Sequence, residues 1–359
     1  MKLLFLHGAI KNCGDFLIAQ RSRLLIQSLV PECEIVSYWE GTDFSKKENY
    51  AALLECDGIV FGGGPFFTNN IYPNDIPLIP DIKALNKPMI NIGGGWYGRD
   101  NKYTTIKNYP LNSESLELLR KIENSTGELS CRDWFTVNML QEKGFKAVMN
   151  GCPAWYDLDY INMTDFQPPK SINRICVSDP AKPKNSKSAV ELLKWLKIRF
   201  PQAAVVLVYH RGINKNTDLY KYAHKENVEI VDISGGHEGF KIYDECQLHI
   251  GYRVHSHIYN MSHRNFSILI EEDGRGAGVN NALGLGNIKA YCEMNFEQPI
   301  LKKFEYKFGY KQNSSLTDEL EAYIAKTYDT DGLEYRQAFE KMQFYYSKMK
   351  QHIETIAKW

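Results

Sequence analysis

The sequence predicts an α/β fold made of two Rossmann-like, doubly wound domains that face each other across a cleft. Short apolar runs typical of buried strands alternate with segments of helical periodicity along most of the chain, which indicates parallel sheets. At 359 residues the chain exceeds the size at which single cores usually stop growing. Near the middle, Pro168-Pro169 marks a linker, because a double proline continues neither a helix nor a central strand.

These signals divide the chain into three parts. We expect an N-terminal domain over residues 1–167, a C-terminal domain over residues 168–330 and a helix within residues 331–359. Apolar side chains recur at helical spacing in that last part, namely Phe339, Met342, Tyr346 and Met349. Such a stripe faces a core. In a two-domain protein this helix can cross back onto the first domain.

The composition excludes several classes of partner. Lys plus Arg and Asp plus Glu balance at 43 each, which argues against a broad surface for nucleic acid or for an anionic membrane. The eight cysteines form no CxxC pair, so neither a zinc knuckle nor a disulfide framework is indicated, and a reduced cytoplasm fits best. No run approaches the ~20 apolar residues of a transmembrane helix. Any membrane contact is therefore expected to be peripheral, at the inner face.

The first domain opens with an apolar strand and alternates from there. Strands are predicted at residues 3–6, 35–38, 56–61 and 88–92. Helices are predicted from the turn 12–16 to about residue 29, over 113–125, and up to residue 141. Gly144 suits the C′ position after the last of these helices, and a turn at Gly151-Cys152-Pro153 closes the domain.

Two of these strands end in glycine triplets, residues 62–64 and 93–95. At one edge of a parallel sheet such triplets let the backbone approach a ligand and present N–H donors, which predicts a binding rim. The spacing differs from the G-x-G-x-x-G of dinucleotide sites, so neither NAD nor FAD is inferred. Alternatively, the glycines only form tight turns between strand and helix.

Two acidic positions in this half have two interpretations each. Asp15 either caps the helix that follows it or binds a ligand. Asp133 is placed to cap the next predicted helix, which leaves Arg132 to point into the cleft. Otherwise Arg132 and Asp133 form an ordinary surface pair of little consequence.

The C-terminal half repeats the alternation. Strands are predicted at residues 172–178, 203–209 and 228–233, with helices at 188–199 and 218–226. The stretch 246–286 adds one βαβ unit, with strands at 248–250 and 266–270 around a short helix.

This βαβ unit is where the chemistry is expected. The carboxyl ends of its strands and the start of its helix face the crevice where ligands bind. Arg253 and His255 follow the first strand and Arg275 follows the second, which predicts a binding site for a carboxylate or phosphate. In the alternative, Arg253 pairs with Glu271 or Asp273 and His255 is an interior histidine. His255 and His257 have no third metal ligand nearby at a suitable spacing, so no metal site is expected.

Taken together, these segments resemble the polysaccharide pyruvyl transferase family over most of the chain. The matching segments are Gly14-Asp15, residues 57–67, residues 92–95, Ser130-x-Arg132-Asp133, Gly151-x-Pro153-Ala154 and Gly251-Tyr252-Arg253-Val254-His255. No single segment is specific, but their order and spacing together are. The resemblance implies a GT-B-like fold and a cytoplasmic transferase of polysaccharide or exopolysaccharide biosynthesis. It also implies phosphoenolpyruvate as donor substrate, a glycan or lipid-linked sugar as acceptor, and no cofactor.

The resemblance also implies roles for individual residues. Arg132, Arg253 and His255 are the expected catalytic residues. Donor contacts are expected from three arginines and four glycines of the rim: Arg132, Arg253, Arg275, Gly63, Gly64, Gly94 and Gly95. The acceptor is expected on the N-terminal side, at Asp15, Phe66 and Trp96. Where relatives tend to show Tyr-Asp-x-Lys, this chain has residues 271–275, so Arg275 stands in for a lysine with a different geometry.

The implied reaction protonates the methylene carbon of phosphoenolpyruvate, after which two sugar hydroxyls attack C2 and phosphate leaves. His255 is the expected general acid, with Glu271 or Asp273 raising its pKa against the neighbouring arginines. Two other functions stay open. Many glycosyltransferases that use a nucleotide sugar place two glutamates eight positions apart in the second domain, and no pair with that spacing occurs between Glu238 and Gly286. A non-catalytic anion- or glycan-binding protein would need only the arginines.

Overall fold

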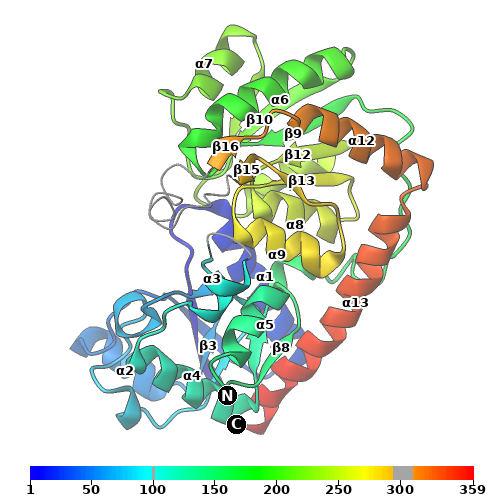
Figure 1. Ribbon diagram of the computed structural model, residues 1–359. Helices are drawn as coiled ribbons and strands as arrows, with labels where there is room; N and C mark the ends of the chain where they lie inside the picture. The colour runs from blue at the N-terminus through cyan, green and yellow to red at the C-terminus, as the bar shows by residue number, and fades with distance from the viewer. Residues whose placement is uncertain (99–101, 294–309) are drawn as a thin grey trace.

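The computed structural model describes residues 1–98, 102–293 and 310–359 and shows two α/β halves stacked on each other (Figure 1). The strands are β1 (Lys2–His7), β2 (Glu34–Trp39), β3 (Gly58–Phe61), β4 (Gly64–Phe67), β5 (Met89–Asn91), β6 (Gly94–Trp96), β7 (Leu129–Cys131), β8 (Ala147–Met149), β9 (Arg174–Ser178), β10 (Ala204–Tyr209), β11 (Glu229–Asp232), β12 (Leu248–Gly251), β13 (Ser267–Glu271), β14 (Ile288–Lys289), β15 (Tyr291–Glu293) and β16 (Tyr310–Gln312). The helices are α1 (Cys13–Leu29), α2 (Lys47–Glu55), α3 (Tyr103–Lys107), α4 (Ser113–Thr126), α5 (Trp134–Gln141), α6 (Ser186–Arg199), α7 (Asp218–Lys225), α8 (Val254–Ser262), α9 (Gly274–Leu283), α12 (Leu316–Asp329) and α13 (Leu333–Ile353).

The N-terminal half contains two parallel sheets rather than one. The first has the strand order β2-β1-β3-β5 and the second the order β4-β6-β7-β8. In the first sheet β2 lies on one side of β1, and β3 and β5 lie on the other. The direction in which successive strands are added to the sheet therefore reverses between β1 and β3. A crevice outside the carboxyl ends of the strands is expected at such a reversal.

The glycine triplets connect these two sheets. The backbone at Gly63 and at Gly93 has a positive φ, 87° and 60°, a region that side chains disfavour. Each triplet redirects the chain from a strand of the first sheet into a short strand of the second, β3 into β4 and β5 into β6. The alternative of a turn into a helix is therefore wrong, because another strand follows each triplet.

The C-terminal half is one parallel sheet with the order β11-β10-β9-β12-β13-β14. This is the doubly wound order in which the reversal lies between the first and fourth strands, here β9 and β12. The predicted βαβ unit is confirmed as β12, α8 and β13. The predicted strands and helices of both halves are present. The elements that were not predicted include helices α2, α3 and α9 and strands β4, β6, β7, β8 and β14 to β16.

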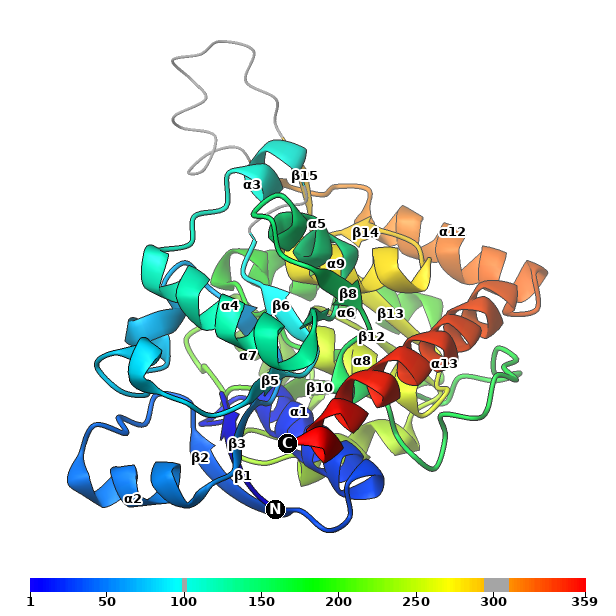
Figure 2. The same ribbon diagram turned by 90° about the horizontal axis from the view of Figure 1, so that it is seen from below.

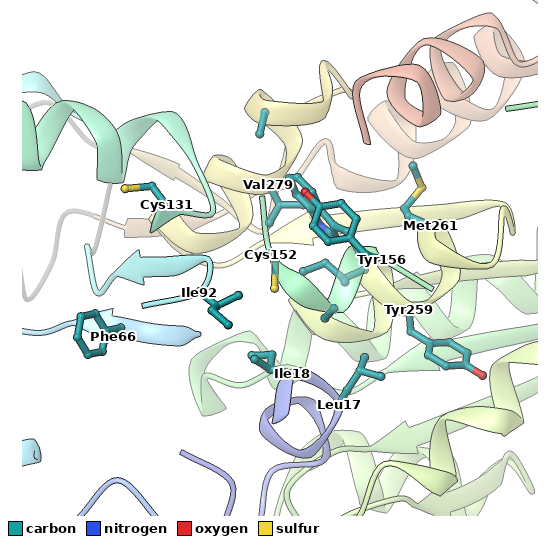
Figure 3. Close-up of a cluster of buried hydrophobic side chains, with 14 of the residues drawn as sticks. Leu17, Ile18, Phe66, Ile92, Cys131, Cys152, Tyr156, Tyr259, Met261 and Val279 are labelled. Atoms are coloured by element: carbon teal, nitrogen blue, oxygen red, sulfur yellow. The ribbon is translucent and has the colours of Figure 1, made fainter. Parts of the chain in front are cut away.

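The core runs through both halves. Leu17 and Ile18 of α1 lie close to Cys152 and Tyr156, and the buried Tyr259 of α8 approaches them from the C-terminal half (Figure 3). Apolar side chains in such numbers hold the halves together chiefly by removing surface from water. The polar groups described below lie at the edge of this packed region.

Helix α13 lies along the outside of both halves (Figures 1 and 2). Near its start the Tyr335 hydroxyl donates to the carbonyl oxygen of Ser267 on β13, at 2.7 Å. Near its end His352 Nε2 lies 3.0 Å from the carbonyl oxygen of Asn91 on β5. Phe339, Met342 and Met349 of the predicted stripe are fully buried. The boundaries expected at residues 167 and 330 stay a prediction.

Within the described ranges, no helix has the length and hydropathy needed to cross a membrane. The cysteines are free thiols, all buried except Cys292. Over the same residues no group of three or more His, Cys, Asp or Glu side chains is arranged to hold a metal ion.

Candidate functional site

A cavity of about 220 Å³ opens between the two halves, at the reversal of strand order in the C-terminal sheet. Five N-terminal residues line it, namely Asn12, Asp15, Pro65, Tyr97 and Arg132. The C-terminal half contributes the remainder, including His210, Arg211, Tyr252, Arg253, His255, Glu272, Asp273 and Arg275. The starts of α1, α5, α8 and α9 all lie at or next to this lining. The positive ends of these helix dipoles favour an anion.

Arg253 is held by an acidic partner that the sequence did not reveal. Its Nε and Nη2 donate to Oδ1 and Oδ2 of Asp179, at 2.8 and 2.6 Å. Asp179 directly follows β9 and Arg253 follows the adjacent strand β12, so the ends of neighbouring strands bring the two together. The predicted alternative, a pair with Glu271 or Asp273, is wrong. Glu271 instead accepts a hydrogen bond from Asn280.

Arg275 forms a second bidentate pair. Its Nε and Nη2 donate to Asp273 at 3.0 and 2.8 Å, and Asp273 also caps α9 by accepting from the Arg275 backbone N–H. Burial opposes ionisation of Asp273, but Arg275 and Lys182 hold the pKa of its carboxyl at about 2. The guanidinium lies over the ring of Tyr97, 5.1 Å from the ring centre, which joins the two halves at the rim of the cavity.

Arg132 approaches from the other half and is 2% exposed. Asp133 caps α5 by accepting from the Thr136 backbone N–H, as predicted, and its second oxygen lies 3.5 Å from Arg132 Nε. No hydrogen bond satisfies Nε or Nη2 of this guanidinium among the described residues. The surface-pair interpretation is wrong, because the pair is buried. Arg132 is thus a buried arginine at the cavity with unused hydrogen-bonding capacity.

His255 lies in the first turn of α8, packed against Gly14 of α1, where a β-carbon would collide with the imidazole ring. Its Nε2 is buried and has no hydrogen-bond partner among the described residues. Burial, with Arg132, Arg275 and Arg253 adding to it, lowers the pKa of His255 to about 3. The expected rise in this pKa is therefore wrong, since Glu271 and Asp273 are engaged by Asn280 and Arg275.

The structure brings together most of the predicted residues, but not all. Arg132, Arg253, His255, Arg275 and Asp15 line the cavity. Gly63 and Gly64 border a second, smaller cavity. Gly94 and Gly95 line neither, because their faces are filled by Phe67 and by Arg132.

The two aromatic residues expected to bind the acceptor do not reach the cavity. Phe66 is 5% exposed and lies within the apolar cluster (Figure 3). Trp96 is fully buried and packs edge-on against Tyr109, with ring centres 5.4 Å apart. Side chains alternate along a strand, so the neighbours Pro65 and Tyr97 point to the cavity instead.

Two residues that line the cavity, His210 and Arg211, and the partner of Arg253, Asp179, were not predicted. His210 and Arg211 directly follow β10, and Asp179 follows β9, so the rule that ligands bind at carboxyl ends of strands applied to them as well. His210 is buried and bonded to Tyr243 at 2.6 Å and to Cys13 at 3.0 Å, which fixes its ring. Arg211 is exposed and stands at the mouth of the cavity.

Comparison with known families identifies the family of the chain. The model of the polysaccharide pyruvyl transferase family matches residues 12–262, well over half of the chain. The chain belongs to the polysaccharide pyruvyl transferase family. It is accordingly a transferase that modifies polysaccharides. The match includes Arg132, Arg253 and His255, whereas Arg275 lies beyond it.

Solved structures agree on the fold of this family member. The S. aureus MnaA–UDP co-structure is 11% identical, with a TM-score of 0.52 over 94% of this chain and 91% of that one. A putative UDP-N-acetylglucosamine 2-epimerase from Listeria monocytogenes is 9% identical, with a TM-score of 0.54 over 96% of this chain and 90% of that one. The expected GT-B-like arrangement of two Rossmann-like domains is confirmed. A search of curated proteins found no match.

In this pyruvyl transferase family member, Gly95→Ala is expected to disturb the site from outside the cavity. A β-carbon at residue 95 would collide with the Arg132 guanidinium, which has to move. Misplacing a catalytic group by about 1 Å can cost on the order of 100-fold in rate. Steady-state kinetics should show that loss. Gly236→Ala is the control, since the added carbon meets only the end of the exposed Glu238 side chain, and its activity should stay at the wild-type level.

Proposed function

We propose that the chain transfers the enolpyruvyl group of phosphoenolpyruvate onto two hydroxyls of a sugar in a glycan or lipid-linked acceptor. A pyruvate ketal forms and phosphate is released. The observation that carries the proposal is the convergence of Arg132 with Arg253, Arg275 and His255 on one small cavity. Phosphoenolpyruvate carries a carboxylate and a phosphate whose second ionisation lies near pH 6, so it is close to trianionic at neutral pH.

The acidic partners of Arg253 and Arg275 orient these side chains without using all of their donors. Each carboxylate takes Nε and Nη2 of its arginine, and no described residue takes Nη1 of either. The guanidinium groups of Arg253 and Arg275 are therefore fixed in orientation, and the Nη1 side of each is left to donate to an anion. Among the described residues Arg132 lacks a comparable bidentate partner, so together with the exposed Arg211 it would supply much of the positive charge that neighbouring carboxylates do not compensate.

Binding of the donor would change the charge state of His255. Burial, with three arginines adding to it, keeps the imidazole neutral, with a pKa of about 3. A nearly trianionic ligand placed among the same arginines reverses the local charge and raises the pKa of the imidazole. His255 would then take up a proton with the donor and deliver it to the methylene carbon.

The test is whether phosphoenolpyruvate binds and turns over. At a concentration about 100-fold above Kd, a ligand that binds only the folded state adds about 2.7 kcal/mol of stability, which thermal unfolding detects. We expect phosphoenolpyruvate to raise the unfolding temperature and to release phosphate when glycosides with free hydroxyl pairs are added. Equal ionic strength of chloride is the control. Stabilisation by a nucleotide sugar and not by phosphoenolpyruvate would contradict the proposal.

A further inference from the structure

A second cavity of about 60 Å³ lies at the other reversal of strand order, in the first sheet. His7 and Gly8 line it at the end of β1, and the glycines 62–64 line it after β3. Glu40, directly after β2, completes the polar lining. Both sheets that carry such a reversal thus have a cavity at the place where α/β proteins bind ligands.

The two cavities are neighbours with opposite electrostatic character. Asp15 and Pro65 belong to the lining of both. The first cavity is bordered by four arginines, whereas no lysine or arginine borders the second within the described residues. A ligand that spans them would therefore be anionic at one end and uncharged at the other, or two ligands would meet at Asp15.

Glu40 has the properties of a proton acceptor in the second cavity. The described contacts give its carboxylate no hydrogen bond and no ion pair, although the side chain lines the cavity. Burial, reinforced by Asp15 and Asp75, raises the pKa of Glu40 to about 7. His7, on the same wall, has its pKa lowered by burial and by Arg23, so it does not neutralise Glu40. A general base works best with a pKa close to the working pH.

We propose that Glu40 accepts the proton of the sugar hydroxyl that attacks the donor, and that the second cavity holds an uncharged polyhydroxyl acceptor. This inference rests on the proposed function. Burial raises the pKa of Asp15 as well, but the Asn12 side chain and the neighbouring Arg211, Arg275 and Arg132 act against that rise, whereas no cation among the described residues does so at Glu40. Asp15 orients a hydroxyl at the boundary between the two cavities, whereas Glu40 removes the proton.

The atoms of the reaction balance with this assignment. One hydroxyl oxygen bonds to C2 of phosphoenolpyruvate as C3 gains a proton from His255, and Glu40 takes the proton of that hydroxyl. The C2–O bond to phosphate then breaks and phosphate leaves with the bonding electrons. The second hydroxyl bonds to C2 and its proton leaves with phosphate, so no oxidant, reductant or metal is needed.

The experiment compares Glu40→Gln with Glu32→Gln, the same change at an exposed position just before β2. The readouts are phosphoenolpyruvate binding by calorimetry and phosphate release with the methyl glycosides of galactose, mannose and N-acetylmannosamine. We expect Glu40→Gln to bind phosphoenolpyruvate within about twofold of wild type but to lose roughly 10²- to 10⁴-fold in phosphate release. The acidic limb near pH 7 in the wild-type profile of kcat/KM should disappear. Glu32→Gln should match wild type throughout.

Thermal unfolding tests the same carboxyl without an acceptor. The pKa of Glu40 is raised from 4.5 to about 7 in the folded state, so its stabilising contribution is complete below pH 4.5 and is lost as the pH rises through 7. Glu40→Gln should therefore unfold at a higher temperature than wild type at pH 8 but not at pH 5. If Glu40→Gln and wild type unfold at the same temperature at pH 8, the Glu40 carboxylate is not destabilising in the folded protein, which would contradict its lack of a compensating partner.

Failure of the inference and failure of the proposed function give different results. If wild type neither binds nor turns over phosphoenolpyruvate, the proposed function is wrong and the inference with it. If wild type turns over and Glu40→Gln keeps full phosphate release, only the inference is wrong. Loss of phosphoenolpyruvate binding in Glu40→Gln, or activity of wild type only with acceptors that carry a carboxylate or sulfate, would overturn the inference as well.

Discussion

Arg132→Met is expected to lower kcat/KM for phosphoenolpyruvate by roughly 10²- to 10⁴-fold. Hydrogen bonds to a charged group contribute about 1.5–3 kcal/mol each, and two donors of this guanidinium, Nε and Nη2, have no hydrogen-bond partner in the described residues. Methionine keeps the length and the apolar contacts of the side chain, so the loss reports on charge. Calorimetry with phosphoenolpyruvate should show the same loss as steady-state phosphate release.

Arg120→Met is the matched control for this prediction. Arg120 is exposed and pairs with Glu123 one turn along α4, where such a pair contributes little. It should bind phosphoenolpyruvate like wild type. If Arg132→Met binds the donor within about threefold of wild type, the N-terminal half does not supply the anion contact and the donor site lies elsewhere.

His255→Gln is expected to reduce kcat by roughly 10²- to 10⁴-fold, the usual contribution of a positioned acid. Binding of phosphoenolpyruvate should weaken much less than kcat, because the imidazole has a pKa of about 3 before the donor binds. The proton that it takes up with the donor adds affinity only as far as its pKa in the complex exceeds the working pH. Single-turnover phosphate release separates the chemical step from binding. The two variants should differ in what they lose. Arg132→Met should lose affinity for phosphoenolpyruvate, whereas His255→Gln should lose the rate at which the bound donor reacts.

His224→Gln serves as the control, because His224 is exposed on α7 and lies outside both cavities. Deuterium incorporation at C3 of phosphoenolpyruvate gives a second readout that needs no complete turnover. An unchanged kcat in His255→Gln would assign the proton to another group, and the protonated phosphate of the donor itself would be the next candidate.

Much of the architecture could be predicted from local sequence. The βαβ unit at 246–286 is marked by two apolar strands around a short helix, and the carboxyl-end rule then placed Arg253, His255 and Arg275 at one crevice. The capping role of Asp133 followed from its position before α5. These features depend on residues close together in the chain.

The missed features depend on contacts between distant segments. Arg253 and Asp179 are separated by 74 positions, and a single sequence does not tell which strands are neighbours. Gly95 was expected to face the ligand, but it makes room for Arg132 because β6 and β7 pair beside each other. Glu40 had no signal in the local sequence, because only the pairing of β2 with β1 brings it beside His7 and Gly8.

Helix α13 bears on how substrates enter. It is hydrogen-bonded to β13 of one half near its start and to β5 of the other near its end. A single helix that is hydrogen-bonded to both halves limits a hinge motion that would move the halves apart. Substrates would then enter the first cavity from the side, through the opening beside Arg211 and Tyr97. A long polysaccharide would place a terminal sugar in the cavity, because an internal segment would have to pass between the two halves.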